Sequence, residues 1–243
     1  MDVPTYGGIV EQFGLGYLAS GADLHVVNGD LALTAHGDLQ LGDSRFAAMH
    51  RFVQQWRFTV PTLHTLFVQG RAASERYANG AMDRDIVASF GLSDDVSIAA
   101  VHSMSDALGA EETNAQVFAG SIVVILNNML QRLRVEVKAP SEAWANAGPV
   151  VKGQCVGPIV CAAAANFRHY DEWLRSRTPT PQQLVSMAAL AHVLEVEKPE
   201  LGRKHAFGRN VCPEVVAALS DDSFDVLGGR VFQYADALAS WNR

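Results

Sequence analysis

The sequence lacks the common signatures of nucleotide and metal chemistry. Gly14-Leu15-Gly16 has no third glycine at dinucleotide-binding spacing, and no Gly-Lys-Ser or Gly-Lys-Thr occurs. There is also no His-Glu-x-x-His and no Gly-x-Ser-x-Gly. These absences argue against nucleotide hydrolysis, the usual zinc peptidases and the α/β-hydrolases, and we expect no cofactor and no metal.

Cysteine is scarce, and its pattern indicates no disulfide framework. Cys155, Cys161 and Cys212 are odd in number and lack the paired spacing of a metal site. We therefore expect buried free thiols in a reducing compartment.

Basic residues are fewer than acidic residues in this chain. The chain carries 19 Lys and Arg against 26 Asp and Glu, for a formal net charge of −7. This balance argues against sequence-independent binding of a nucleic-acid backbone over a broad surface, although a local basic groove stays open.

Targeting and membrane signals are also missing from the pattern. Met1-Asp2-Val3-Pro4 has neither a basic start nor an apolar run of signal-peptide length. No segment approaches the roughly 20 consecutive apolar residues of a membrane span. We expect a cytoplasmic protein without a membrane partner.

The strongest pattern that is present predicts a helix from Pro158 to Ser176. Gly157 can cap it, Pro158 suits the first helical position, alanine dominates the middle and Thr178-Pro179 stops the run. At about 100° per residue, one stripe of this helix should face a core. That stripe contains Ile159, Val160, Ala163, Phe167, Tyr170 and Leu174.

A candidate site follows one edge of that stripe. Asn166, His169 and Trp173 recur at i, i+3 and i+7, where an imidazole held by a neighbouring amide can still be reached by a partner. Arg168 points away and can pair with Glu172 at i, i+4. The alternative is a boundary histidine that satisfies a buried polar atom.

Elsewhere the pattern predicts a mainly α fold, a helical bundle with a small N-terminal antiparallel β-meander, or α+β overall. The first twenty residues are rich in glycine, which predicts a loop with one helical turn. Asn28-Gly29 predicts a hairpin, and a third strand at 39–41 completes a meander packed on the bundle. Asp30, His36 and Asp38 are interpreted as turn formers rather than ligands.

The remaining helices are separated by proline and glycine. One starts at Asp43 or Ser44 and ends near Phe58, and Pro61 opens a second that Asn79-Gly80 stops. Residues 82–108 fit a helix or a strand, and we favour a helix. Further helices are predicted over Thr113–Val137, from Pro181, over Pro213–Ser220 and over Arg230–Trp241. A soft boundary near residue 80 divides the chain into 1–80, the meander plus helices, and 81–243, the helical bundle, which can also form one domain.

Residues 113–197, with long antiparallel helices and the cluster of Asn166, Arg168 and His169, resemble bacterial HEPN-domain proteins. This resemblance implies a toxin or antiviral defence protein, acting as a homodimer that cleaves RNA. In that family an arginine precedes a histidine by four to six residues on one helix, whereas Arg168 and His169 are adjacent. Arg45 with His50 has the family spacing and is a secondary candidate, as has Arg57 with His64, but about one or two such matches arise by chance.

Two functions from different classes remain open. In a metal-independent RNase, His169 takes a proton from the ribose 2′-hydroxyl, Arg168 stabilises charge on the phosphate, and Asn166 orients the imidazole. In a non-enzymatic interaction module, Trp173 and Tyr170 contact a protein partner or a second copy. A third reading, from the Asp30–Thr34 and Gly37–Leu39 pattern, is a phage structural protein.

Overall fold

The computed structural model describes residues 2–18, 24–27, 31–34, 44–90, 95–175, 179–197 and 207–241, and side chains are described for these except 24–27, 31–34 and 44. Helices dominate, which confirms the mainly α fold class. They are α1 Tyr6–Gln12, α2 Ser44–Ser89, α3 Asp95–Glu136, α4 Ser141–Asn146, α5 Val156–Arg175, α6 Pro181–Leu194, α7 Cys212–Ser220 and α8 Phe224–Ala239, with a 3-10 turn η1 at Gly16–Leu18.

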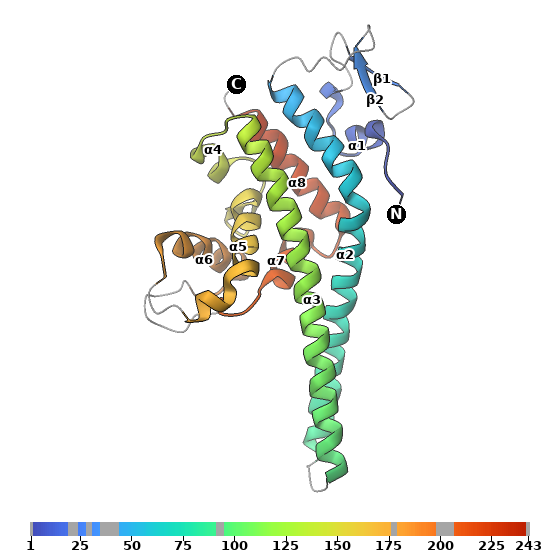
Figure 1. The fold of residues 1–243 in the computed structure, drawn as a ribbon, viewed down its shortest axis with the longest axis vertical. Helices are drawn as coiled ribbons and strands as arrows, with labels where there is room; N and C mark the ends of the chain where they lie inside the picture. Colours follow the sequence, from blue (N-terminus) through green and yellow to red (C-terminus); the bar gives the residue numbers. More distant parts are fainter. Residues whose placement is uncertain are drawn as a thin grey trace.

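The longest helices, α2 and α3, run side by side and extend beyond the rest of the molecule as an arm (Figure 1). The prediction of two helices divided at Pro61 is wrong, because Pro61 lies inside the continuous α2. An internal proline costs about 3 kcal/mol. Trp56 and Val60 before it and Leu63 and Phe67 after it are all buried. Burial of each such side chain contributes about 1.5–3 kcal/mol, so packing offsets the lost hydrogen bond.

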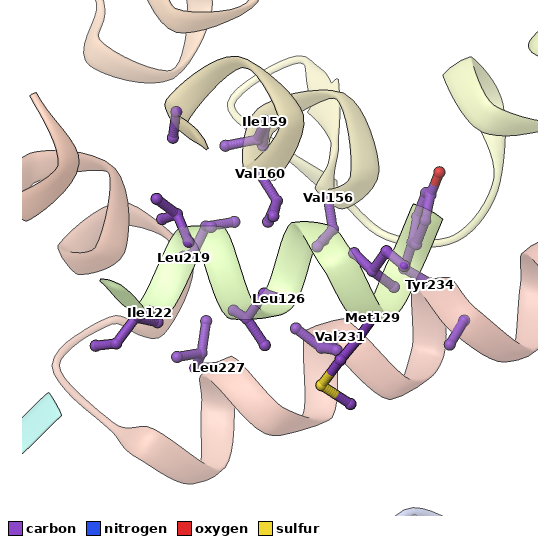
Figure 2. Packing of buried hydrophobic residues seen from close by; sticks show 14 of the residues in the cluster. Ile122, Leu126, Met129, Val156, Ile159, Val160, Leu219, Leu227, Val231 and Tyr234 are labelled. Atoms are coloured by element: carbon purple, nitrogen blue, oxygen red, sulfur yellow. The ribbon is translucent and has the colours of Figure 1, made fainter. Parts of the chain in front are cut away.

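The other helices form a head around the proximal half of the arm. Figure 2 shows α3 between α5 and α8, with Val156 and Val160 of α5 on one side and with Leu126 and Met129 of α3 pointing toward Leu227 and Val231 of α8 on the other. The core also includes the N-terminal residues, because the ring of Phe13 stacks on that of Phe232 at 4.1 Å between centroids. Residue 80, the predicted boundary, lies within α2.

The first twenty residues contain a helix where the glycine content predicts a loop. The hydroxyl of Thr5 accepts a hydrogen bond from the Gly8 N–H and so caps α1. Tyr6 and Ile9 are buried beneath α2. The helix forms because this apolar face packs on the core, which the local glycine count does not reveal.

The predicted three-stranded meander packed on the bundle is not supported. β1 Leu24–Val27 and β2 Leu31–Thr34 pair antiparallel, while the third strand and Asp30, His36 and Asp38 fall outside the described residues. The small sheet that joins the described core is β3 Val150–Val151 with β4 Gln154–Cys155, in which Val151 and Cys155 are buried. Lys152 and Gly153 turn between its strands at φ 46° and 83°, as a two-residue hairpin of this type requires.

Within the described part of the chain, α3 alone is long and apolar enough to cross a membrane, with a mean hydropathy of 1.2 over its most apolar window. The sequence pattern predicts no membrane-spanning segment and does not single out α3. Half of that window is buried inside the protein, and core helices of soluble proteins meet the same test.

Candidate functional site

Asn166, the first of the predicted site residues, lies in the core. Its side chain is 0% exposed, and its Nδ2 donates to the carbonyls of Phe207 and Arg209, both at 3.1 Å. Its Oδ1 accepts from the backbone N–H of Val211 at 3.0 Å. Every bond therefore goes to the segment that precedes α7, and the predicted role of orienting His169 is wrong.

The predicted core stripe of α5 is confirmed at Ile159, Val160 and Ala163, which are buried, but it is wrong near the end of the helix. Trp173, predicted to contact a partner, is only 2% exposed, whereas Leu174, predicted to face the core, is 64% exposed. Tyr170 is also exposed. The reason is that α3, α6 and α7 all pack on α5, and the 207–211 segment covers the polar Asn166, which an apolar stripe cannot anticipate. Gly157, predicted as a cap, lies within the helix against the Tyr234 hydroxyl.

His169 and Arg168 lie on the exposed surface near the end of α5. The Nδ1 of His169 is 3.2 Å from the Oε1 of Glu172, and both side chains are about half exposed or more. Glu172 thus pairs with the histidine, in place of the predicted pair with Arg168. The structure leaves His169 beside a carboxylate and an arginine, but without Asn166.

The secondary candidates do not form a shared site. Arg45 donates to Asp236 at 2.9 Å and lies over the ring of Tyr17. His50 is buried, with Nδ1 3.0 Å from the Tyr6 hydroxyl oxygen. Burial lowers the pKa of His50, and so does the nearby positive charge of Arg51. Arg45 and His50 thus contact different partners, and the spacing between them does not give them a common one.

The thiols are free, as predicted. Cys155 and Cys212 are buried, and Cys161 is half-buried beside Gln131. Burial raises the pKa of all three thiols, most of all Cys212. A raised pKa keeps a thiol protonated and a poor nucleophile. Among the described residues, no three His, Cys, Asp or Glu side chains gather as metal ligands.

A groove between the arm and α7 was missed by the sequence reasoning. Two adjoining cavities of about 120 and 610 Å³ share Ser74, Ala115, Pro213 and Ala217 as lining. The smaller cavity has an apolar lining that includes Phe67, Ala119, Ile122 and Val216. A concave apolar floor of this kind accepts an apolar side chain of a partner.

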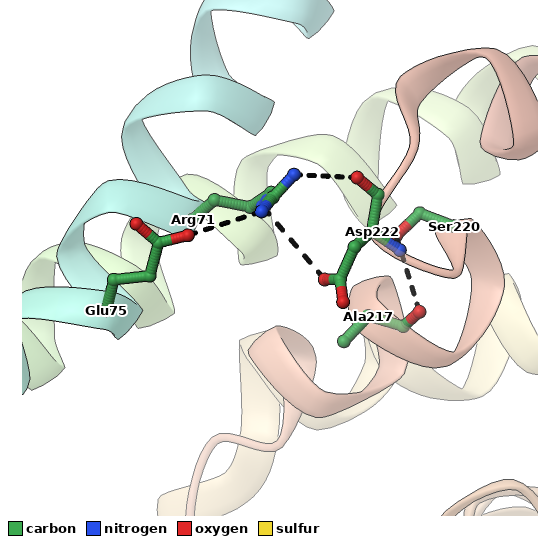
Figure 3. A network of polar contacts seen from close by, with 5 residues as sticks. All are labelled: Arg71, Glu75, Ala217, Ser220 and Asp222. Atoms are coloured by element: carbon green, nitrogen blue, oxygen red, sulfur yellow. Dashed lines mark hydrogen bonds and ion pairs between the residues drawn. The ribbon is translucent and has the colours of Figure 1, made fainter. Parts of the chain in front are cut away.

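Charged pairs border both ends of this groove. Figure 3 shows Arg71 of α2 pointing toward Asp222, whose backbone carbonyl accepts its hydrogen bond at 2.7 Å, and toward Glu75 at 3.2 Å. At the other end Arg209 pairs with Glu214 at 2.6 Å. Arg209 belongs to the 207–211 segment, whose backbone is hydrogen-bonded to Asn166. Asn166 therefore supports this wall of the groove from the core side.

The arm presents a second surface on the side of α2 that faces away from α3. The exposed fractions of Val68, Met82 and Ile86 are 47%, 65% and 50%. Farther out, none of the described residues 81–90 and 95–107 is buried, although Phe90 and Val96 are large and apolar. The signal existed as a heptad spacing in the sequence, but the helix stop predicted at Asn79-Gly80 divided it, whereas α2 continues to Ser89.

No family model, curated protein or solved structure matches this chain. Its function is therefore inferred from these surfaces alone. The described chain offers an exposed histidine–carboxylate pair on α5, a groove beside α7 and an apolar outward face on the arm.

Proposed function

We propose that the protein is a cytoplasmic, non-enzymatic helical interaction module whose contact surface is the outward face of α2 on the arm. The observation that carries this proposal is the exposure of Met82 and Ile86 of α2 on a part of the arm where no described residue is buried. Large apolar side chains gathered on one exposed face mark an interaction site. Scattered single residues would need no such explanation.

The shape of the arm supports the same proposal. A helix pair that extends beyond its own core gains little stability from burial, and short isolated helices are marginal in water. The exposed residues become buried when another helix packs on the arm. The groove at its base continues the surface, with fixed charges at both ends.

Site-specific photo-crosslinking in cells that produce the protein tests the proposal. A photoreactive residue at Ile86 should form covalent adducts with another polypeptide, since that face is covered. The matched control places the same residue at Val135, an apolar side chain that is 73% exposed at the other end of α3. Adducts at neither position, or equally at both, would contradict an interaction surface on the arm.

A second candidate is a metal-independent endoribonuclease of the HEPN toxin or defence type, acting as a homodimer. The exposed pair of His169 and Glu172, next to Arg168, supports it. With Nδ1 turned toward the carboxylate, Nε2 is available to take a proton from a ribose 2′-hydroxyl, and Arg168 can stabilise the phosphate charge.

The ribonuclease candidate is tested with labelled total RNA and transfer RNA in EDTA. Cleavage by the wild type, lost in His169→Ala, would support catalysis at the end of α5. Intact RNA with both proteins would leave the interaction module as the function.

A further inference from the structure

We propose that the occupant of the outward face of α2 is α2 of a second copy, packed antiparallel as a coiled coil. This inference rests on the proposed function, because it names the partner of the same surface. It follows from the spacing, size and charge of the residues along one face of the helix.

The outward face carries a heptad seam of its own. Six residues follow one another at intervals of four, three, four, three and four: Val68, Ala72, Glu75, Asn79, Met82 and Ile86. This is the alternation of a and d positions in a coiled coil. The seam that packs inward has the same alternation and is buried throughout: Met49, Val53, Trp56, Val60, Leu63, Phe67 and Gly70. The two seams lie on roughly opposite sides of α2. The sequence of α2 therefore suits packing on both sides, with its own core on one and another helix on the other.

An antiparallel pairing centred on Tyr77 matches the outward seam to itself. It places Val68 opposite Ile86 of the second copy, and small Ala72 opposite large Met82. Each layer then sets an a position against a d position, as antiparallel coiled coils require. In the central layer the Glu75 carboxylate faces the Asn79 side-chain amide of the second copy, which can donate a hydrogen bond to it.

Charge selects the antiparallel direction. The distal arm carries exposed Asp83, Asp85 and Asp95 and remains acidic although Arg84 donates to Asp85 at 2.8 Å, whereas Arg71 lies on α2 near the base. Antiparallel packing sets Arg71 beside Asp85 of the second copy, on the flank of the seam. Parallel packing would align the acidic ends with each other, and like charges oppose such a pairing.

Arg76, the other arginine beside the seam, does not prevent the pairing by charge repulsion. Arg76 approaches its own counterpart across the two-fold axis, but both its Nε and Nη2 donate to Glu111 at 2.8 Å. This bidentate pair compensates its charge within each chain. Two arms packed in this way form a four-helix bundle and cover the outward seam on both copies.

The mass in solution is the first test. Light scattering after size exclusion should give twice the chain mass of 26.2 kDa. Met82→Glu combined with Ile86→Glu should raise the dimer Kd by about a hundredfold or more, because it places unpaired charges in the seam. Val135→Glu, on α3 outside the seam, should leave the Kd unchanged, and circular dichroism should show the same helix content in all three proteins.

Cysteine pairing tests the register. Ala72→Cys protein mixed with Met82→Cys protein should form a disulfide heterodimer under mild oxidation, while Met82→Cys protein alone should not. The native thiols are buried or half-buried. A link formed by Met82→Cys alone, without the mixed link, would overturn the antiparallel register.

Charge exchange tests the flank. Arg71→Glu and Asp85→Arg should each weaken the dimer, and the two together should restore it. Arg71 also bonds Asp222 and Glu75 within its own chain, but loss of those bonds is not repaired by Asp85→Arg. No recovery in the double variant would contradict the proposed neighbours.

The mass in solution also distinguishes the proposed pairing of two copies from the proposed interaction surface on the arm. A single-chain mass at about 100 μM would overturn pairing between copies. If photo-crosslinks from Ile86 to another protein were still found, the arm would remain an interaction surface with a different partner. If they were absent too, both proposals would fail.

Discussion

The side chain of Asn166 on α5 holds the backbone of Val211, whose N–H donates to its Oδ1 at 3.0 Å. Together with two bonds from its Nδ2, this fixes the segment that leads into α7 and carries one wall of the groove. Asn166, which the sequence pattern places in a candidate reactive cluster, therefore stabilises the tertiary structure.

Asn166→Ala should lower the free energy of unfolding by about 2–4 kcal/mol, because three buried hydrogen bonds lose their partner. For a chain of this length, each kcal/mol shifts Tm by about 2–4 °C. Urea and thermal unfolding measure the loss. A variant as stable as the wild type would mean that water or a rearranged segment satisfies the freed backbone groups.

His169→Ala should change the free energy of unfolding by no more than about 0.5 kcal/mol, since the imidazole and its Glu172 partner are exposed. The same urea titration measures it. A large loss of stability would show that His169 has a structural role, and the cleavage assay with this variant could then not be interpreted as catalysis.

Stability should fall in mild acid because of His50. Its folded pKa is lowered by burial, while the unfolded value is about 6.5. As the pH falls below about 6.5, the unfolded chain takes up a proton that the folded chain does not. Folding is thereby weakened until the pH reaches the folded pKa.

His50→Gln should reduce this dependence, because glutamine can still reach the Tyr6 hydroxyl but does not titrate. Unfolding free energies at about pH 7.5 and about pH 5.5 give the comparison. His102→Gln, on the exposed surface of the arm, is the matched control. An equal pH dependence in wild type and His50→Gln would show that another group is responsible.

The sequence predicts most helices but not what covers them. The central helix, the helix predicted over Thr113–Val137 and the helix from Pro181 follow from periodicity, caps and proline stops, and the structure contains them as α5, the second half of α3 to Glu136 and α6. The capping box of Thr180 and Gln183 is present as such a pattern requires. Local signals suffice there because they act within one turn.

The candidate site could not be predicted in the same way. The pattern places Asn166 at the edge of the apolar stripe beside His169, because its actual partners are backbone groups more than forty residues away in the chain. Pro61 looks like a break because its local cost is visible, while the burial that offsets it comes from other helices. In both cases tertiary contacts override a correct local tendency.

Two glycines on long helices should respond in opposite ways to alanine. A Cβ at Gly157 would lie 2.1 Å from the Tyr234 hydroxyl oxygen, on a ring that is fully buried and donates to the Trp144 carbonyl at 2.8 Å. Because that ring cannot withdraw without breaking this bond, Gly157→Ala should destabilise by about 1–3 kcal/mol. A Cβ at Gly109 would meet nothing within 4 Å, in the middle of α3.

Gly109→Ala should therefore raise the free energy of unfolding by about 0.5–1 kcal/mol, through helix propensity and lower chain entropy in the unfolded state. Thermal unfolding of the two variants beside the wild type measures both signs. Stabilisation by both substitutions would mean that Tyr234 does not pack tightly on α5. A loss in both would mean that the exposed arm at Gly109 is already covered, as it would be if another chain packed there.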